Sequence, residues 1–323
     1  MHDALGRTIN YLRLSVTDRC NLRCHYCMPA EGIEQLGHTD ILSFEELLQI
    51  VTAASQIGIR KVRITGGEPL VRKGVIGLIE DIAQVPGIEQ VTLTTNGLLL
   101  NGQVQALWDA GIRRLNVSLD SLQAHTFSEI SRGGDLQKVL SGLEEAENAG
   151  MKIKLNMVVM RGVNDQEIVP FAALSQQKPW SVRYIEYMPV IREKGWQQKI
   201  VTGSEILQRL QEVFTLEEIS RTLYCGPAKP YRIKNALGTV GIITPMSDHF
   251  CGSCNRIRVT STGFAKSCLL SEGGIDLKSA LQQSDPEALQ NALQQVISDK
   301  PSEHHLNSDP EGSTPFSMSK IGG

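Results

Sequence analysis

Two kinds of hydrophobic pattern alternate along the first two thirds of the chain. Short runs of branched apolar residues are typical of buried strands, and longer stretches with apolar residues three and four positions apart are typical of amphipathic helices. The short runs predict strands at residues 11–17, 61–65, 90–95, 114–119, 152–159 and 182–187. The longer stretches predict a helix from Ser43, whose capping box with Glu46 marks a helix start, to Gly58, and further helices at 75–84, 104–110, 136–149, 165–175 and 204–213.

The six strand–helix units predict an α/β fold in which helices cover a mainly parallel sheet. Because eight units close a full barrel, six predict an open, partial (β/α)6 barrel of the TIM type, and a doubly wound sheet is the alternative. Both architectures bind ligands at the carboxyl ends of the strands. The first closely spaced cysteines and residues 66–69 (GGEP) follow predicted strands, so we expect them at that end.

The regular alternation ends near residue 224. Beyond it, glycine and proline separate short strand-like runs at residues 231–233, 238–243 and 257–260, and a last helix is predicted at 285–297. The pattern therefore predicts two domains, a partial-barrel domain over residues 1–223 and a small C-terminal domain over residues 224–323.

The composition is that of a globular protein, with 323 residues, 41% hydrophobic and 21% charged, and a net charge of −3. This balance argues against a nucleic-acid-binding protein with a broad basic surface, although it allows a local basic pocket. No apolar run reaches the roughly 18 residues of a membrane span. The first ten residues lack the apolar core of a signal peptide, so a cytoplasmic protein without a membrane partner is expected.

Three of the seven cysteines, Cys20, Cys24 and Cys27, lie close together near the start of the chain. Three thiolates are one fewer than a closed structural zinc site needs. They suit a [4Fe–4S] cluster whose fourth iron stays open for a small molecule that carries an amine and a carboxylate. A zinc knuckle is the alternative that the spacing alone allows.

The second group consists of Cys251, Cys254 and Cys268. Its spacing leaves two interpretations open, an iron–sulfur cluster with an open iron or a zinc site with His249 as the fourth ligand. The remaining cysteine, Cys225, fits neither group and is interpreted as a free thiol.

The first group, with Tyr26 directly before Cys27, resembles the cluster motif of the radical S-adenosylmethionine (SAM) superfamily, and residues 66–69 (GGEP) resemble that superfamily's motif for the methionine amine. The resemblance implies that Cys20, Cys24 and Cys27 hold a [4Fe–4S] cluster and that SAM binds its open iron. It also implies contacts with SAM from Tyr26, Gly67, Ser118 and Met188. A glycine at position 67 has no Cβ and would let the backbone approach the methionine closely.

Within the superfamily, the chain resembles the GTP 3′,8-cyclase family of molybdenum cofactor biosynthesis over nearly its whole length. The resemblance rests on residues 12–20 (LRLSVTDRC), 65–70 (TGGEPL), 116–121 (NVSLDS), 186–189 (EYMP), 250–258 (FCGSCNRIR) and 321–323 (IGG). It implies that Cys251, Cys254 and Cys268 hold a second [4Fe–4S] cluster, whose open iron binds the guanine of GTP. It implies a GTP site made by Arg13, Arg63, Thr94, Lys154, Arg256, Ile257 and Arg258, and it leaves open whether Arg183 contacts the substrate.

Three of these cations also stand out by position alone. Arg13, Arg63 and Lys154 lie within or beside otherwise apolar predicted strands, where a charge without a partner would be costly. GTP carries about four negative charges, and arginine pairs with phosphate through its bidentate fork. The positions of the three cations therefore favour a pocket for a triphosphate over a solvated surface.

The resemblance implies a homodimeric lyase that cyclises GTP by a radical reaction. It implies that Gly322 and Gly323 enter the active site and assist catalysis, and that the product passes to the cyclic pyranopterin monophosphate synthase. The electron donor is unidentified. Two alternatives are a radical SAM enzyme that modifies peptides or RNA, which tends to carry more auxiliary cysteines, and a zinc-stapled binding module without redox chemistry.

Overall fold

The computed structural model describes residues 1–34, 36–37, 39–189, 195–220, 226–248, 250–271, 273–283, 285, 287–303 and 318. The strands are β1 (Tyr11–Ser15), β2 (Lys61–Thr65), β3 (Gln90–Thr95), β4 (Arg114–Ser118), β5 (Lys152–Val159), β6 (Ser181–Glu186), β7 (Leu216–Glu218), β8 (Lys229–Ile233), β9 (Thr239–Ile243), β10 (Arg256–Val259), β11 (Phe264–Lys266) and β12 (Ile275–Asp276). The α-helices are α1 (Phe44–Gln56), α2 (Val75–Gln84), α3 (Val104–Asp109), α4 (Ala124–Ser131), α5 (Leu136–Asn148), α6 (Ile168–Gln177), α7 (Gly203–Gln211), α8 (Lys278–Leu281) and α9 (Ala288–Ser298). The 3-10 helices are η1 (Pro69–Val71), η2 (Asp165–Glu167), η3 (Trp196–Lys199) and η4 (Cys251–Ser253).

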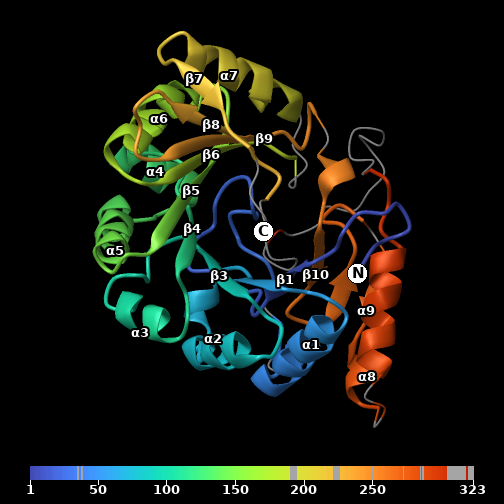
Figure 1. Cartoon of the computed structure of the whole chain (residues 1–323). Coiled ribbons are helices and arrows are strands. Elements are labelled where there is room, and N and C mark those ends of the chain that lie inside the picture. The colour runs from blue at the N-terminus through green and yellow to red at the C-terminus, as the bar shows by residue number, and fades with distance from the viewer. Residues whose placement is uncertain are drawn as a thin grey trace.

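One curved sheet forms the frame of the described residues, and the helices cover its outer face (Figure 1). Its strand order is β12-β11-β10-β1-β2-β3-β4-β5-β6-β9-β8-β7. All pairs from β10 through β1–β6 to β9 are parallel, and the pairs at both ends are antiparallel. Strands β1 to β6 are neighbours in chain order, whereas a doubly wound sheet reverses its order at a switch point. The predicted open, partial barrel is therefore confirmed.

Local sequence signals account for where the first helix begins. Ser43 Oγ accepts a hydrogen bond from the Glu46 amide at 3.2 Å, and Glu46 Oε2 accepts one from the Ser43 amide at 2.7 Å. This is the predicted capping box, which satisfies two amides that a helix start leaves unpaired. Helix α4 was not predicted from the sequence.

The pleat of the strands divides the side chains between two faces. In β1, Leu12 and Leu14 are fully buried in the core between sheet and helices, whereas Arg13 lines the interior of the barrel. The same alternation repeats in β2, where Val62 and Ile64 enter the core and Arg63 lies inside the barrel. A polar inner face is unusual for a barrel core and indicates a binding cavity rather than a packed interior.

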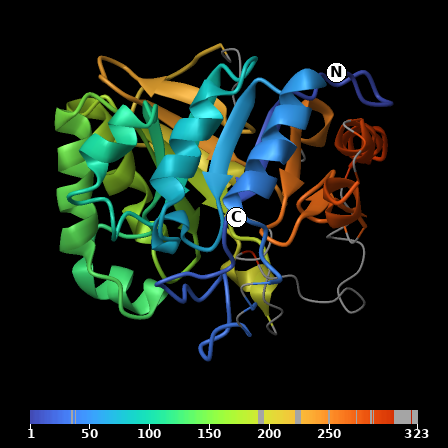
Figure 2. The same cartoon turned by 90° about the horizontal axis from the view of Figure 1, so that it is seen from below.

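The C-terminal strands continue the barrel sheet at both of its ends. Strand β10 pairs with β1 and β9 pairs with β6, so they add a strand on each side of β1–β6. Helix α9 packs beside α1 on the outside, as Figures 1 and 2 show. The predicted domain division between residues 223 and 224 falls among residues 221–225, outside the described ranges, and stays a prediction.

None of the helices in the described part of the chain combines the length and the apolar character that a membrane span requires.

Candidate active site

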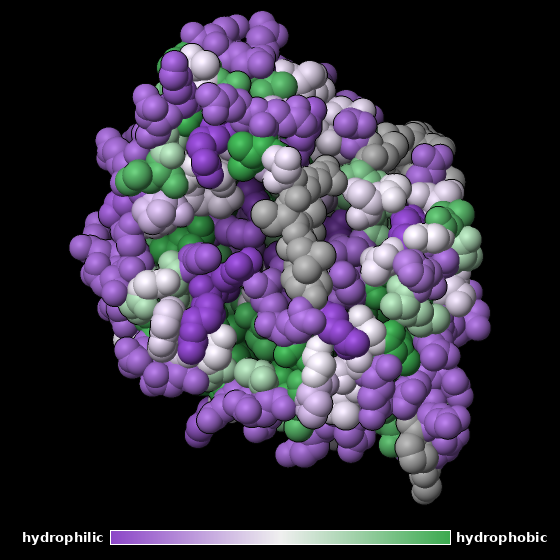
Figure 3. Space-filling view, in the orientation of Figure 1, coloured by the Kyte–Doolittle hydropathy of each residue, from purple (hydrophilic) through white to green (hydrophobic). Residues whose placement is uncertain are grey.

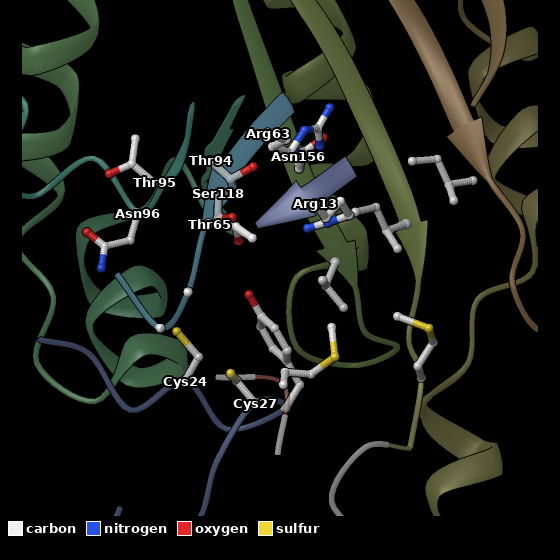
Figure 4. Close-up of a pocket in the computed structure, with 18 of the residues that line it drawn as sticks. Arg13, Cys24, Cys27, Arg63, Thr65, Thr94, Thr95, Asn96, Ser118 and Asn156 are labelled. Carbon is white, nitrogen blue, oxygen red and sulfur yellow. The ribbon is translucent and has the colours of Figure 1, made fainter. Parts of the chain in front are cut away.

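A cavity of about 220 Å³ opens at the carboxyl ends of the parallel strands. The face seen in Figure 1 is hollowed near its centre in the space-filling view, with hydrophilic side chains around the hollow (Figure 3). Figure 4 shows that the cavity has two chemically different ends. The sulfurs of Cys24 and Cys27 lie at one end, and Arg13 and Arg63 lie at the other.

The loop of the first cysteine group is fastened to the turn after β2. The Gly67 amide donates to Thr17 O at 2.8 Å, and the Glu68 amide donates to Arg19 O at 2.8 Å. A Cβ on Gly67 would lie 2.3 Å from Arg19 O, which no real Cβ tolerates. The reason for glycine expected from the sequence was close approach to methionine. The structure gives a different reason for glycine at position 67, because this position is in close contact with the backbone of Arg19, directly before Cys20.

Replacing Gly67 with alanine should therefore displace the cysteine loop. We expect a loss of about 1–3 kcal/mol in the free energy of unfolding and less iron bound at the first cysteine group after reconstitution. Thermal unfolding and iron analysis measure both effects. Gly77→Ala is the matched control, because a Cβ there meets nothing within 4 Å inside α2, and alanine favours a helix. Equal iron content in the two variants would contradict this interpretation.

A buried carboxylate joins two strand ends next to this loop. Glu68 accepts hydrogen bonds from the Leu70 amide at 3.0 Å, from Thr95 Oγ1 at 2.9 Å and from the Asn96 amide at 2.7 Å. Burial raises the pKa of Glu68 to about 7, although these hydrogen bonds act in the opposite direction. Glu68 thereby holds the turn after β2 against the end of β3.

The first three thiols have the chemistry of an iron–sulfur site. Burial, followed by the charges of Asp120 and Cys27, holds the pKa of Cys24 well above its usual value, and burial also raises the pKa of Cys20. Bound metal ions supply the positive charge that such thiolates need. No three His, Cys, Asp or Glu side chains among the described residues converge as ligands of a single metal ion. Each thiolate of a [4Fe–4S] cluster binds its own iron, and Cys20, Cys24 and Cys27 line one cavity, so the three thiols fit a cluster whose fourth iron is open.

The four predicted SAM contacts all line the cavity: Tyr26, Gly67, Ser118 and Met188. The hydroxyl of Tyr26 donates to Asp120 Oδ2 at 2.8 Å, and Asp120 Oδ1 accepts from the Val158 amide at 2.9 Å. Burial raises the pKa of Asp120 to about 6. The sequence analysis assigned no role to Asp120, although its position two residues after Ser118 at the end of β4 was a signal.

Three arginines form a row across adjacent strands, and two of them, Arg13 and Arg63, line the opposite end of the cavity. Arg13 of β1 lies directly opposite Arg258 of β10 on one side and Arg63 of β2 on the other. Burial, followed by repulsion from Arg258 and Arg63, lowers the pKa of Arg13 well below its usual value. Like charges held this closely in a buried place repel one another, so this row of arginines is suited to bind a polyanion.

Two polar atoms beside this row have no hydrogen-bond partner within the described residues. They are Arg63 Nε and Thr94 Oγ1, and both are buried. Buried polar groups nearly always have a partner in a native structure. Both residues line the cavity, so a bound ligand with acceptor and donor atoms would complete them.

Other predicted GTP contacts differ in their placement. Arg256 and Arg183 line the cavity, whereas Arg258 and Lys154 are not among its lining residues, and Lys154 lies on β5 opposite Asn116 of β4. Ile257 points the other way, with its side chain fully buried in the hydrophobic core. A contact between Ile257 and GTP would therefore have to come from its backbone.

The second cysteine group lies behind the arginine end of the cavity. Cys251 begins η4, Cys254 follows it, and Cys268 comes after β11; none of the three lines the cavity itself. Arg256, which does line it, donates from Nη2 to Cys254 Sγ at 3.5 Å. Burial raises the pKa of Cys254, but the charges of Arg256 and Lys300 outweigh burial and lower it to about 6. Cys254 is therefore poised to bind metal as a thiolate.

The loop that leads to this second group has a buried anchor that the sequence analysis missed. Glu186, fully buried at the end of β6, accepts from the Gly203 amide at 2.6 Å. Its other carboxylate oxygen accepts from the amides of Met246 at 2.9 Å and Ser247 at 3.0 Å. Only its position beside Met188 in the stretch 186–189 marked it in the sequence.

Several predicted residues lie outside the described ranges. These are His249, Cys225, Gly322 and Gly323. Met318, which lies four residues before Gly322 in the sequence, lines the cavity.

Comparisons with known proteins identify the family of the chain. The family model described as "Radical SAM superfamily" matches residues 14–174, and the model described as "Molybdenum Cofactor Synthesis C" matches residues 180–306. The GTP 3′,8-cyclase of Geobacter sulfurreducens is 55% identical over 322 residues, 99% of both chains. The GTP 3′,8-cyclase of Alkaliphilus metalliredigens is 48% identical over 325 residues and all of both chains. The chain belongs to the GTP 3′,8-cyclase family.

A solved structure resembles the fold of this member of the GTP 3′,8-cyclase family. Streptococcus suis SuiB bound to S-adenosylmethionine superposes with a TM-score of 0.63 at 15% identity, over 89% of this chain and 68% of the SuiB chain. At this identity the likeness concerns the fold alone, and it supports the partial barrel. The predictions of a GTP 3′,8-cyclase family member and of a radical SAM enzyme with iron–sulfur chemistry are confirmed.

Proposed function

We propose that this chain is a lyase that converts GTP into (8S)-3′,8-cyclo-7,8-dihydroguanosine 5′-triphosphate, the first step of molybdenum cofactor biosynthesis. One observation carries the proposal beyond the family assignment. Arg13 and Arg63, neighbours on β1 and β2, line a cavity whose other end carries the first cysteine loop. In our proposal these two ends of one cavity are the triphosphate site and the SAM site.

In this proposal Cys20, Cys24 and Cys27 hold the first [4Fe–4S] cluster, and the second cysteine group holds the other. The chemistry that the first cluster and SAM supply when bound is one-electron cleavage of the sulfonium, which yields a 5′-deoxyadenosyl radical able to abstract the 3′ hydrogen of GTP. In our proposal the cavity holds this reaction, and SAM binds at the end lined by Tyr26, Gly67, Ser118 and Met188. Exclusion of water by such a cavity protects a reactive primary radical from side reactions.

The chain's own contribution to ring closure is orientation. In our proposal the arginine row holds the triphosphate through bidentate hydrogen bonds, and Thr94 adds a hydroxyl. Cys251, Cys254 and Cys268 would hold the second cluster, which would supply an open iron as a binding site for the guanine. Fixing both ends of one nucleotide keeps C3′ near C8, and such orientation contributes up to about 7–11 kcal/mol in intramolecular reactions.

The position of Lys154 leads to the prediction that GTP binding takes up a proton. Burial, followed by repulsion from Arg183 and Lys61, lowers the pKa of Lys154 to about 6, so this amine is mostly neutral in the free protein at pH 7.5. A triphosphate would raise that pKa, so GTP binding should take up close to one proton. GTP affinity should then fall as the pH rises above about 6, by up to tenfold per pH unit.

Titration calorimetry in buffers of different ionisation enthalpy measures this uptake. Lys154→Met should abolish it, and Lys152→Met, two residues earlier and exposed on the same strand, should retain it. Proton uptake that persists unchanged in Lys154→Met would contradict the assignment of Lys154 to the GTP site.

The proposal also includes roles for the C-terminal glycines and for partners of the chain. We infer that Gly322 and Gly323 enter the cavity and assist the second half of the reaction, and the position of Met318 in the cavity wall supports this. The family resemblance supports a cytoplasmic homodimer that receives electrons from an unidentified donor. It also supports transfer of the product to the cyclic pyranopterin monophosphate synthase.

The proposed function is tested by substrate choice. Protein reconstituted anaerobically with iron and sulfide is incubated with SAM, a reductant and each nucleoside triphosphate in turn. We expect a cyclised product from GTP alone, because the site at the second cluster is proposed to bind guanine. Absence of product from GTP, or equal conversion of ATP, would overturn the proposal.

A further inference from the structure

A buried group of charged residues lies behind the second cysteine group and takes no part in the mechanism above. Asp3, Arg7 and Lys300 have exposed fractions of 7%, 9% and 5%. Two come from the start of the chain and one from the segment after α9, so they join parts of the chain that are almost 300 residues apart. Burying such charges is costly unless every polar atom is satisfied.

Arg7 satisfies that requirement in full. Its Nε donates to Asp3 Oδ2 at 2.5 Å, which pairs the two charges. Nη1 donates to Cys251 O at 3.0 Å and to Ser302 O at 3.4 Å. Nη2 donates to Pro301 O at 2.8 Å and to Lys300 O at 3.2 Å. All five N–H groups of the guanidinium are thus used, four of them on backbone carbonyls.

Lys300 holds the other two cysteines of the group. Its Nζ donates to Ser267 O at 2.6 Å, directly before Cys268, and to Arg256 O at 2.9 Å, two residues after Cys254. The positive charge of Lys300 also acts on the Cys254 thiol. Together with the bond from Arg7 to Cys251, one buried cation or the other holds the backbone at or beside each of the three cysteines.

We infer that Arg7 and Lys300 are positioning residues, which hold Cys251, Cys254 and Cys268 together before the second cluster assembles and fix the start of the C-terminal tail beside it. The inference rests on the proposed function, because it presupposes a cluster at the second group. The three cysteines lie on two separate loops, and ordering them in advance removes a conformational cost from cluster binding. Residues that orient metal ligands in this way typically contribute 10- to 100-fold to metal affinity.

The charge of Lys300 has a second consequence. Reduction adds negative charge to an iron–sulfur cluster, and a nearby cation stabilises the reduced form. Removing this cation should lower the reduction potential of the second cluster, whereas an arginine at the same position should maintain it. A residue with a purely structural role would not produce this pattern.

The test uses the full-length chain with Cys24→Ala, so that the second cluster alone is present. Reconstituted protein is challenged with an iron chelator, and the potential is measured by a redox titration followed by electron paramagnetic resonance. We expect Lys300→Met to release iron about 10- to 100-fold faster and to have a lower potential. Lys300→Arg should recover the potential, and Arg7→Lys should release iron faster with less effect on the potential.

Lys278→Met is the matched control, because Lys278 Nζ also donates to a backbone carbonyl, that of Asp40 at 3.0 Å, but away from both cysteine groups. If Lys300→Met and Arg7→Lys both match the parent in iron release and potential, the inference is wrong while the proposed function stands. If the Cys24→Ala parent binds no iron at all, the second cluster and the proposed function fail together. If Lys300→Met fails to fold, Arg7→Lys and Lys300→Arg carry the test. Faster iron release from Arg7→Lys, with the parent potential kept in Lys300→Arg, supports the inference. Iron release from Arg7→Lys at the parent rate contradicts it.

Discussion

Cys254→Ala should leave SAM cleavage intact and lower GTP conversion at least 100-fold. The first cysteine group, at the other end of the cavity, is unchanged in this variant, so 5′-deoxyadenosine should still be released. The second cluster loses a ligand, and the guanine loses its anchor. Misplacement of reacting atoms by about 1 Å is enough for a 100-fold loss of rate. Chromatography of 5′-deoxyadenosine and of the cyclised nucleotide measures both outputs in one reaction.

Two further variants serve as controls for Cys254→Ala. Cys24→Ala should abolish both outputs, because the first cluster supplies the electron. Cys225→Ala removes the one cysteine outside both groups and should keep both outputs. A Cys254→Ala enzyme that still cyclises GTP at the normal rate would show that the second group has no role in holding the substrate.

The second large effect concerns Arg63. Replacing it with methionine should weaken GTP binding by about 2–5 kcal/mol, at least 30-fold, because a charged partner of the triphosphate is lost. The same change should stabilise the free protein by about 1 kcal/mol. Burial and the charge of Arg256 both lower the pKa of Arg63, so its charged form is disfavoured where it lies. Equilibrium binding and chemical unfolding measure the opposite effects.

Arg60→Met is the control for this pair of measurements. Arg60 Nη1 donates to Ser55 O at 2.9 Å and to Ile59 O at 3.1 Å, outside the cavity. Losing these bonds should not stabilise the protein, and GTP affinity should stay unchanged. If Arg63→Met destabilised the free protein as a typical core substitution does, the arginine row would serve the fold rather than the ligand.

The strands and most helices were predictable because their signals are local. Residues 61–65, 90–95 and 152–159 coincide with β2, β3 and β5, since β-branched runs between glycines have few other solutions. The position of β10 was not predictable, because nothing local indicates that residues 256–259 pair with β1, about 245 residues earlier. Tertiary pairing of this kind decides which arginines become neighbours.

The candidate site was predictable in its residue types and only partly in its geometry. The cysteine spacings and the motif at 66–69 identified the chemistry. The inward direction of Arg13 and Arg63 follows from the pleat, and so does the outward direction of Ile257, which the sequence analysis overlooked. The buried anchors Asp120 and Glu186 lie in the family-like stretches 116–121 and 186–189, but nothing in the sequence showed their role, since most of their partners are backbone amides.

The most direct test of the proposed reaction follows the hydrogen atom at C3′ of GTP. GTP labelled with deuterium at C3′ is given to the anaerobically reconstituted enzyme with SAM and a reductant, and the released 5′-deoxyadenosine is analysed by mass spectrometry. If this chamber holds the ribose of GTP against SAM, the deuterium appears in 5′-deoxyadenosine in proportion to the cyclised product. Unlabelled 5′-deoxyadenosine, released while product forms, would contradict the account.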